Sequence, residues 1–397
     1  MKPTNSAVWQ RPVADYDVLI IGAGIYGCGA AQAAAASGYT TRIIEKNRIA
    51  SGTSSQSTKL IHGGLRYLEQ ANLKLVYEAL AEREHLLRLA PELVSREWFY
   101  IPVYEDSRRP VWMIRAGLLL YWLLSAGRSR FRQIPRQQWS ELLPGLNQAR
   151  LKAVLAYEDA ATDDAALTLA VAESAKQFGC EISESTSLQR ATYDGSCWHL
   201  KLSSGEMISA RILINATGAW INRLGNRIKP APPRQAMHLV QGSHLMLNRH
   251  CPGFIYSESV DGRVMFFRPW QGKTLAGTTE TPYSDDPARI KPTGEEIASI
   301  LASYNHYFPQ MQCKKSDIIG TYCGLRVLPE SEGGAFAASR ETILRCDNEK
   351  QPTYIAIYGG KLTTYRRESA RVVKLIGRTV PPPHLADTRK IPLTRSE

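Results

Sequence analysis

The sequence predicts an α/β protein: a Rossmann-like dinucleotide-binding domain, discontinuous along the chain, with a second lobe built on an antiparallel sheet. A strand–glycine–helix–strand unit near the N-terminus predicts the first part. Short alternating strand-like runs between residues 237 and 279 predict the second. The length of 397 residues is enough for two or three lobes with a sizeable core.

The first unit occupies residues 16–46. Its strand, helix and second strand lie at residues 18–21, 30–36 and 40–44. Gly22, Gly24 and Gly27 follow the first strand in the G-x-G-x-x-G spacing, which permits a tight turn, close approach of a pyrophosphate and close helix–strand packing. The helix N-terminus offers N–H groups to phosphates, and Glu45 at the end of the second strand can accept from ribose hydroxyls. The unit therefore predicts a bound dinucleotide.

Composition narrows the class of protein. The formal net charge of +12 favours an anionic partner, and nucleic acid, anionic lipid or an anionic substrate would each satisfy it. Seven cysteines without C-x-x-C spacing predict a reducing compartment, and no metal-ligand cluster stands out. Residues 1–14 lack the apolar core of a signal peptide, and the longest apolar run, residues 116–124, is too short to span a membrane.

A hydroxyl-rich stretch follows the dinucleotide unit. Its hydroxyls can donate to phosphate or ribose, although a solvated loop would explain any one of them. They are Ser51, Thr53, Ser54, Ser55, Ser57 and Thr58. After the strand-like residues 59–61 come His62, Gly63 and Gly64, and the glycine pair predicts a close approach of the backbone to another group. We expect the whole stretch to contribute to the dinucleotide site.

Periodicity predicts the remaining elements. A 3.6-residue apolar period predicts helices over residues 65–88, 295–308 and 362–376. Short alternating or apolar runs predict strands or hairpins at residues 187–209, 211–216, 237–247, 254–257, 264–270, 274–279, 317–328, 335–345 and 351–361, with a turn signal at Asp261-Gly262. Glu158 and Asp159 predict an acidic turn after a strand that begins at Leu151, and Asp163 predicts a helix N-cap.

An apolar helix flanked by arginines is predicted within residues 108–136. Trp112 and Trp122 lie on it, and the arginines are Arg108, Arg109, Arg115, Arg128, Arg130 and Arg132. This composition suits a helix in a membrane interface with arginines on lipid phosphates. A core helix with a basic loop is an equal alternative. Nucleic acid is not the expected partner, because no other basic stripe is interleaved with aromatic residues that could stack on bases.

The segment ASGTSSQSTKLIHGGLRYLE at residues 50–69, together with the opening motif, resembles the FAD-dependent glycerol-3-phosphate dehydrogenases and α-glycerophosphate oxidases. These belong to the D-amino-acid-oxidase-like flavoproteins. The resemblance continues at residues 78–89, 157–169, 215–220, 241–244, 277–280 and 358–366, so it covers nearly the whole chain. The late YGGKLTTYR motif is a specific signature.

The resemblance implies FAD as the cofactor and assigns residues to it. They are Gly22, Gly24, Gly27, Glu45, Lys46, Thr53, Ser54, Ser57, Thr58, Lys59, His62, Gly63, Gly64, Thr217, Gly218, Gly359, Gly360, Lys361, Leu362 and Thr363. It implies an FAD-binding domain at residues 15–95, 150–230 and 335–378. A substrate-binding cap is expected at residues 96–149 and 231–334, and a C-terminal tail at 379–397. The further C-terminal helical domain of longer family members is not expected here.

Oxidation of an alcohol by a flavin needs a base for the hydroxyl proton and a group that stabilises charge on the ring. Lys361, at a helix start after Gly359 and Gly360, can supply the positive charge that stabilises the ring. The resemblance places Lys361 near the substrate, Arg326 on its phosphate or hydroxyl, and Arg66, Tyr67 and His244 at further active-site positions. An ordinary histidine pKa suits His244 for accepting a proton. The alternatives are a surface Lys361, an Arg66 paired with Glu69 or Glu78, and a core position for Tyr67 or His244.

The activity implied is oxidation of sn-glycerol 3-phosphate to dihydroxyacetone phosphate, with electrons passing to a quinone. The enzyme would lie in the cytoplasm, attached to the inner face of the membrane. Alternatives are an oxidase, a dehydrogenase of another small hydroxy acid or amine, a flavin-dependent RNA-binding protein, and a scaffold without turnover. The oligomeric state stays open, a homodimer included. One departure from the family puts the head group in doubt, because Val327 rather than proline follows Arg326.

Overall fold

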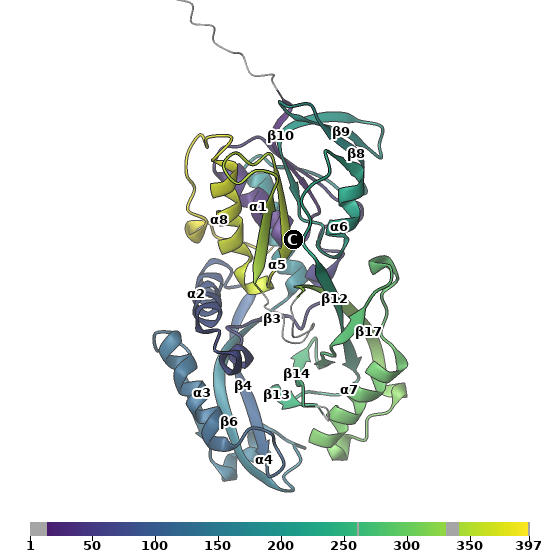
Figure 1. Cartoon of the computed structure of the whole chain (residues 1–397). Helices are drawn as coiled ribbons and strands as arrows, with labels where there is room; N and C mark the ends of the chain where they lie inside the picture. Colours follow the sequence, from purple (N-terminus) through teal and green to yellow (C-terminus); the bar gives the residue numbers. More distant parts are fainter. Residues whose placement is uncertain (1–13, 260–261, 331–340, 396–397) are drawn as a thin grey trace, which may run out of the picture.

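The computed structural model describes residues 14–259, 262–330 and 341–395, and it contains two sheets, one above the other in Figure 1. Helices α1, α5 and α8 lie beside the upper sheet, and α3 and α7 lie beside the lower one. Asp261 and residues 335–340, for which a turn and a hairpin are predicted, are outside the described residues. The predicted α/β class with a second, mainly antiparallel sheet is confirmed.

The upper sheet has a parallel centre. Its strands, in spatial order, are β11 (Ile228–Lys229), β8 (Leu188–Tyr193), β9 (Trp198–Leu202), β10 (Met207–Asn215), β1 (Tyr16–Ile21), β2 (Thr41–Ile44) and β7 (Glu181–Ser183), with β19 (Tyr354–Gly359) on β10 and β18 (Thr342–Cys346) on β19. Strand β1 is buried on both faces, so Val18 and Ile20 enter one core while Leu19 and Ile21 enter the other. This explains the continuous apolar run in its sequence.

Three helices cover one face of this sheet. They are α1 (Ile25–Ala36), α5 (Asp164–Gln177) and α8 (Tyr365–Ile376), and they contribute to the same core. The predicted N-cap is confirmed: the Asp163 carboxylate accepts from the backbone of Ala165 at 3.1 Å and Ala166 at 3.3 Å. The short α6 (Ile221–Leu224) packs toward the other face, against the β8–β9 hairpin.

The lower sheet contains the predicted alternating strands. Its order is β16 (Thr281–Tyr283), β12 (Met237–Leu247), β15 (Lys273–Gly277), β14 (Val264–Trp270), β13 (Phe254–Glu258), β4 (Val94–Tyr104), β6 (Leu151–Thr162) and β3 (Leu60–Ile61), with β17 (Ile318–Pro329) on β12 and β5 (Phe131–Ile134) on β6. The helices around it are α2 (Leu73–Leu89), α3 (Val111–Leu124), α4 (Trp139–Leu142) and α7 (Gly294–Tyr307). No helix among the described residues combines the length and apolarity needed to cross a membrane.

Strand β6 corrects one prediction. It pairs with β4 in the lower sheet. The predicted acidic turn is wrong, because Glu158 and Asp159 lie inside this strand and are buried. Glu158 pairs with Arg130, and Asp159 accepts from Arg83 at 2.9 Å. The assignment of residues 150–230 to the FAD-binding domain stays a prediction.

The helix predicted over residues 65–88 is divided. A 3₁₀ helix, η2, covers Leu65–Gln70. Ala71 follows it with a left-handed φ of 53°, and α2 begins at Leu73. The break turns the chain after the glycine pair, so Arg66 and Tyr67 precede α2 rather than lie on it.

The described part of the C-terminal tail packs on the upper domain. His384 Nε2 lies 2.8 Å from the carbonyl of Ala36, the last residue of α1. Leu393 is buried and its backbone N–H donates to Leu89 O at 2.7 Å. The tail therefore connects the ends of α1 and α2.

Candidate active site

A cavity of about 680 Å³ lies between the two sheets. Its walls include the carboxyl ends of β1 and β2, the hydroxyl-rich loop, and strands β12 and β17. Ligands of open α/β sheets bind at this edge, where the strands end and the helices begin. The cavity therefore lies where the glycine motif predicts the dinucleotide.

The glycines of the motif have separate roles. Gly22 has a φ of 104°, and a Cβ there would lie 2.8 Å from the Ala216 carbonyl oxygen. Gly24 lines the cavity at the start of α1. Gly27 is outside the lining, and its Cβ would overlap the Gly22 carbonyl oxygen. Gly27 is thus required for helix–strand packing rather than for ligand contact.

Glu45 is held at the cavity wall by backbone donors. Its carboxylate accepts from Ala23 N at 2.8 Å and from Asn47 N at 2.9 Å. Each carboxylate oxygen can accept a second hydrogen bond, so ribose hydroxyls can still be bound. Next to it, the Lys46 ammonium lies 3.5 Å from the ring centroid of Trp220.

The hydroxyl-rich loop connects the two sheets. Ser54 Oγ accepts from Ile25 N in α1 at 2.9 Å, and Thr53 Oγ1 donates to Leu325 O in β17 at 2.9 Å. Ser57 Oγ donates to Asp164 at 2.6 Å. Lys59 is outside the cavity lining, because its buried ammonium pairs with Asp164.

Most of the predicted site residues line this one cavity. They are Gly22, Gly24, Glu45, Lys46, Thr53, Ser54, Ser57, Thr58, His62, Gly64, Arg66, Tyr67, Thr217, Gly218, His244, Arg326, Gly359, Gly360, Lys361, Leu362 and Thr363. Gly27, Lys59 and Gly63 are outside it. A Cβ on Gly63 would lie 2.5 Å from Tyr121 Oη and 2.6 Å from Leu80, so what approaches this glycine is α2 and α3.

Two arginines converge at the part of the cavity wall formed by β12 and β17, here called the roof. Arg66 Nη1 and Arg326 Nη1 each lie 3.4 Å from Glu280 Oε1. Arg326 also donates to Thr279 O at 3.3 Å and to Thr278 Oγ1 at 3.2 Å. Within the described part of the chain, Glu69 pairs with Arg109 and Glu78 with Arg367. The acidic partner of Arg66 is therefore Glu280 across the cavity, and the expected pairing along its own helix is wrong.

Strand β17 continues past Arg326. Val327 pairs with Leu239 of β12, and the strand ends at Pro329. The residue after Arg326 therefore lies in a paired strand and not in a loop. The strand predicted over residues 317–328 includes this position, and Val327 itself lines the cavity.

Lys361 faces the same cavity from the opposite sheet. Gly359 and Gly360 precede it with φ of 68° and 94°, values that favour glycine. Its backbone N–H donates to Tyr26 Oη at 2.8 Å, and its ammonium lies 3.8 Å from the ring centroid of Tyr67. Tyr67 is buried in the core and also lines the cavity, so both positions considered for it from the sequence hold.

His244 is buried on β12. Its Nε2 lies 3.0 Å from Thr58 Oγ1, and its ring stacks on Tyr322 at a centroid distance of 4.8 Å. Burial and the positive charges of Arg326 and Lys59 lower the pKa of His244 to about 3. The ordinary pKa expected from the sequence is therefore wrong, and the imidazole is neutral at physiological pH.

Sequence reasoning missed Glu280 and Gly242. Glu280 is the shared partner of both arginines. Gly242 leaves room for Arg326, since a Cβ there would lie 2.9 Å from Nη2. Two arginines expected at one small site signal the need for a nearby carboxylate, but nothing local in the sequence identifies which one.

Comparison with known proteins gives the family. The family model described as FAD dependent oxidoreductase matches residues 17–366. The chain belongs to the FAD-dependent oxidoreductase family. The resemblance found in the sequence is confirmed, and this oxidoreductase uses FAD as its cofactor.

Several curated relatives of the oxidoreductase are similar over most of its length. A glycerol-3-phosphate dehydrogenase of Pseudomonas aeruginosa is 37% identical over 370 residues, which are 90% of this chain and 71% of the relative. An aerobic glycerol-3-phosphate dehydrogenase of Escherichia coli is 36% identical over 365 residues, with 88% and 71% covered. A D-erythritol 1-phosphate dehydrogenase of Brucella abortus is 31% identical over 367 residues, with 89% and 72% covered.

Solved structures agree on the fold. The glycerol-3-phosphate dehydrogenase of Bacillus halodurans, complexed with FAD, aligns with a TM-score of 0.74 at 27% identity and covers 95% of this chain and 67% of its own. The L-α-glycerophosphate oxidase of Mycoplasma pneumoniae, with FAD bound, aligns with a TM-score of 0.75 at 16% identity, with 96% and 99% covered.

The residues of the oxidoreductase fit FAD. The glycine at the start of α1 leaves space that a Cβ would fill, and the wall beside it combines a carboxylate with hydroxyl groups. This donor and acceptor set suits a pyrophosphate between two sugars. Gly22, Gly24, Glu45 and the 53–58 loop would hold the adenosine and pyrophosphate, and residues 359–363 would contact the ring.

Proposed function

We propose that the enzyme oxidises sn-glycerol 3-phosphate to dihydroxyacetone phosphate and that its electrons pass to a quinone. One observation carries the proposal: Arg66, Arg326 and Lys361 line one cavity together with a neutral histidine, His244. A small phosphorylated alcohol needs cations for its phosphate and an unprotonated base for its hydroxyl. The names of the relatives support the same substrate class.

The arginines provide substrate binding in this proposal. Their planar guanidinium groups can give paired hydrogen bonds to phosphate oxygens. Glu280 lies against both arginines, and the substrate phosphate would bring further negative charge to the same two guanidinium groups. Bound phosphate would also offset the positive charge that lowers the pKa of His244, so the imidazole becomes a stronger base when substrate is present.

The remaining groups act on the reaction itself. His244 accepts the hydroxyl proton at its unprotonated ring nitrogen, and Lys361 stabilises negative charge that develops beside it. When bound, FAD supplies the acceptor for the hydride that leaves the substrate carbon. Tyr67 supports the Lys361 ammonium by contact with its ring.

A longer polyol phosphate is the second candidate substrate. The 31% identical relative from Brucella abortus is named for D-erythritol 1-phosphate. Val327, where the resembled family has proline, lines the cavity beside Arg326 and so changes the wall nearest the head group.

The test is anaerobic reduction of the purified holoenzyme by a panel of substrates. Sn-glycerol 3-phosphate should bleach the flavin absorbance, whereas glycerol, lactate and glycine should not. Faster bleaching by D-erythritol 1-phosphate would favour the second candidate, and no bleaching by either phosphate contradicts the proposal. Reoxidation by a soluble quinone analogue supports the dehydrogenase, while peroxide formation on admission of air indicates an oxidase.

Arg326→Ala tests the assigned site. It should raise KM for sn-glycerol 3-phosphate at least tenfold, because a charge-assisted phosphate contact contributes about 1.5–3 kcal/mol. Arg190→Ala, at an exposed position on β8, is the matched control and should leave KM unchanged. Equal KM values for both variants would remove Arg326 from the site.

We also propose that the enzyme attaches peripherally to an anionic membrane through α3. This helix buries Leu118 and Tyr121 but exposes large apolar side chains, with Trp112 69% and Leu123 57% exposed. The Arg130 side chain, 71% exposed, lies beyond its C-terminal end. Apolar side chains beside arginines match a helix at the lipid headgroup level.

Sedimentation with vesicles tests the attachment. The enzyme should sediment with phosphatidylglycerol vesicles and less with phosphatidylcholine, and Trp112→Ser with Leu123→Ser should release it. Leu385→Ser, which removes an 81% exposed leucine in the tail, is the matched control. Binding that is unchanged in the α3 variant, or a stronger interaction with tRNA in a gel shift, contradicts the membrane proposal.

A further inference from the structure

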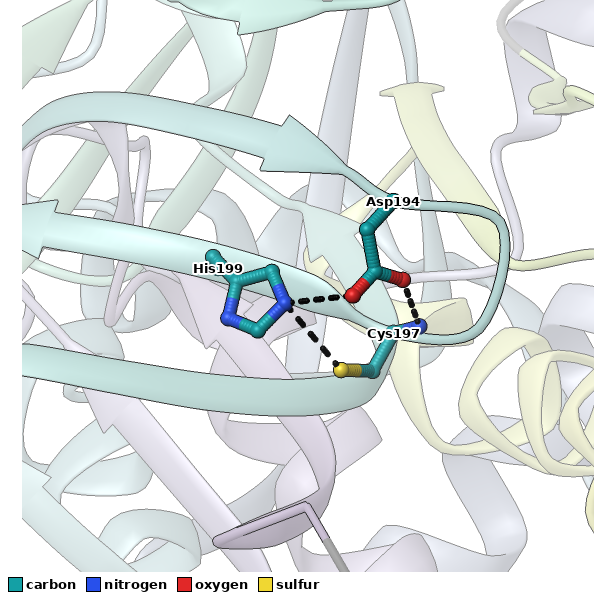
Figure 2. A group of neighbouring side chains, drawn as sticks. All are labelled: Asp194, Cys197 and His199. Atoms are coloured by element: carbon teal, nitrogen blue, oxygen red, sulfur yellow. Dashed lines mark hydrogen bonds and ion pairs between the residues drawn. The ribbon is translucent and has the colours of Figure 1, made fainter. Parts of the chain in front are cut away.

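Three potential metal ligands meet at the turn of the β8–β9 hairpin. Asp194, Cys197 and His199 each direct one ligand atom inward, and these atoms all lie within 4.8 Å of one another (Figure 2). None of the three lines the cavity between the sheets. The sequence did not reveal the group, because its D-x-x-C-x-H spacing matches none of the common cysteine or histidine motifs.

The hairpin brings these residues together for local reasons. Cys197 and His199 are two residues apart along the extended backbone at the start of β9, so their side chains share one face. The Asp194 carboxylate accepts from Ser196 N at 2.7 Å and Cys197 N at 2.9 Å, which folds the turn back over the strand. Gly195, with φ of 97°, allows this tight return.

We propose that Asp194, Cys197 and His199 form a metal site for a borderline-soft divalent cation, Zn²⁺ in the first place. Thiolate, imidazole and carboxylate are the three protein ligand types that Zn²⁺ accepts together, and three of them leave a fourth position for water.

The distances support tetrahedral coordination. His199 Nε2 and Cys197 Sγ are 3.6 Å apart. Zn–N and Zn–S bonds of about 2.0 and 2.3 Å at a tetrahedral angle separate these two atoms by roughly 3.5 Å. Asp194 Oδ2 lies 2.7 Å from the same Nε2, so it must retreat by roughly half an ångström to become the third ligand.

The surrounding charge favours a cation. The Asp194 carboxylate places one negative charge at the turn, within reach of the thiol and the imidazole. Asp15 adds a second negative charge nearby, because it accepts a hydrogen bond from Ser209 N, and Ser209 of β10 pairs with His199 of β9. The Cys197 thiol is 4% exposed and must lose its proton on binding, a cost that the metal–sulfur bond offsets.

Cobalt substitution of the holoenzyme tests the site. Difference spectra against cobalt-free holoenzyme should show a thiolate-to-cobalt charge-transfer band that saturates at one equivalent, and added Zn²⁺ should abolish it. Cys197→Ser should remove the band, and His199→Asn should weaken binding at least tenfold. Cys346→Ser, which removes the half-buried thiol of β18, is the matched control and should keep the band.

The outcomes are decisive either way. A band that persists in Cys197→Ser, or no band at millimolar cobalt in the unmodified enzyme, overturns the proposal. Thermal melting gives a second readout: Zn²⁺ should raise the melting temperature of the unmodified holoenzyme and of Cys346→Ser, but not that of His199→Asn. Turnover should stay the same, because the hairpin turn lies outside the cavity.

Discussion

At the scale of single residues, His244 shows how neighbours override the intrinsic chemistry of a side chain. A histidine with an ordinary pKa would change charge near pH 6.5. Here burial, Arg326 and Lys59 lower the pKa of His244 to about 3, so the proton binds to the unfolded chain at pH values where the folded protein excludes it. The folded state is therefore favoured above pH 6.5 and loses stability as the pH falls from 6.5 toward 3.

This charge state predicts the pH dependence of turnover. Between pH 5 and 8, kcat/KM should show no inflection that belongs to His244, since the imidazole stays neutral over the whole range. His244→Asn should lower kcat/KM by roughly a hundredfold or more, the usual effect of losing a general base. An inflection in both enzymes belongs to the substrate phosphate, whose second pKa is about 6. An inflection near 6.5 that is present in the unmodified enzyme and absent in His244→Asn would contradict the lowered pKa.

At the scale of elements, we expect the turn from β1 into α1 to control cofactor binding. Gly22→Ala should reduce FAD affinity at least tenfold, because the new Cβ must push Ala216 while the left-handed backbone costs about 1–2 kcal/mol. FAD bound per chain, read from absorbance, measures the effect.

Gly205→Ala separates backbone strain from crowding. Gly205 has a φ of 88°, similar to the value at Gly22, but no atom lies within 4 Å of the Cβ position. This variant should bind FAD normally and lose only stability. Equal loss of FAD in Gly22→Ala and Gly205→Ala would show that crowding at the β1–α1 turn is not what weakens FAD binding.

Another element-scale feature is the contact between α7 and the roof strands. The buried Glu296 carboxylate accepts from Ser243 Oγ at 2.7 Å, Thr279 Oγ1 at 2.6 Å and Thr281 Oγ1 at 2.8 Å. It also accepts from Gln241 and caps its own helix. Because these residues flank His244 and Glu280, Glu296 positions the roof of the site without lining the cavity itself.

Glu296→Gln should destabilise the protein by about 2 kcal/mol, since an amide cannot accept from all these donors. It should also raise KM, because strand β17 carries Arg326, which we propose to bind the substrate phosphate. Glu295→Gln, at the exposed neighbouring position, is the control for loss of charge in the same helix turn. Denaturant unfolding and steady-state kinetics check both effects. A Glu296→Gln variant as stable as Glu295→Gln would contradict the role assigned to the carboxylate.

At the scale of the whole molecule, the cavity proposed to bind FAD lies between the two sheets. Both sheets contribute to the cavity wall, so FAD binding should stabilise the entire chain. At a free FAD concentration of 100 times Kd the gain is about 2.7 kcal/mol. Melting curves of the apoprotein and of the reconstituted enzyme test this, and equal midpoints would mean that FAD does not bridge the sheets.

Local patterns made most of this architecture predictable. The glycine spacing, the Asp163 cap and the alternating runs of β12 and β14 act over a few residues, and the structure has them as expected. Pairing over long distances was not predictable. Glu158 and Asp159 read as a turn because their partners, Arg130 and Arg83, lie 28 and 76 residues away in sequence.

In the candidate site, too, local patterns were predictable and contacts between distant residues were not. Gly63 was correctly recognised as a point of close approach, but the group that approaches is Tyr121 from a helix whose placement the sequence does not reveal. Glu280 was missed because its role depends on two arginines from different elements. The Asp194–Cys197–His199 group depends on the geometry of a single turn.

The packing of the C-terminal tail against α1 should affect how tightly FAD is held. Its histidine contacts the last residue of α1, and the first turn of the same helix lines the cavity where we expect the pyrophosphate of FAD. Proteolytic cleavage or a bulky tag near His384 would remove the contact at the C-terminal end of α1. The N-terminal end of the same helix lies at the proposed nucleotide site, so we expect nucleotide binding to weaken. Preparations trimmed at the carboxyl terminus should therefore release their yellow colour more readily than intact ones.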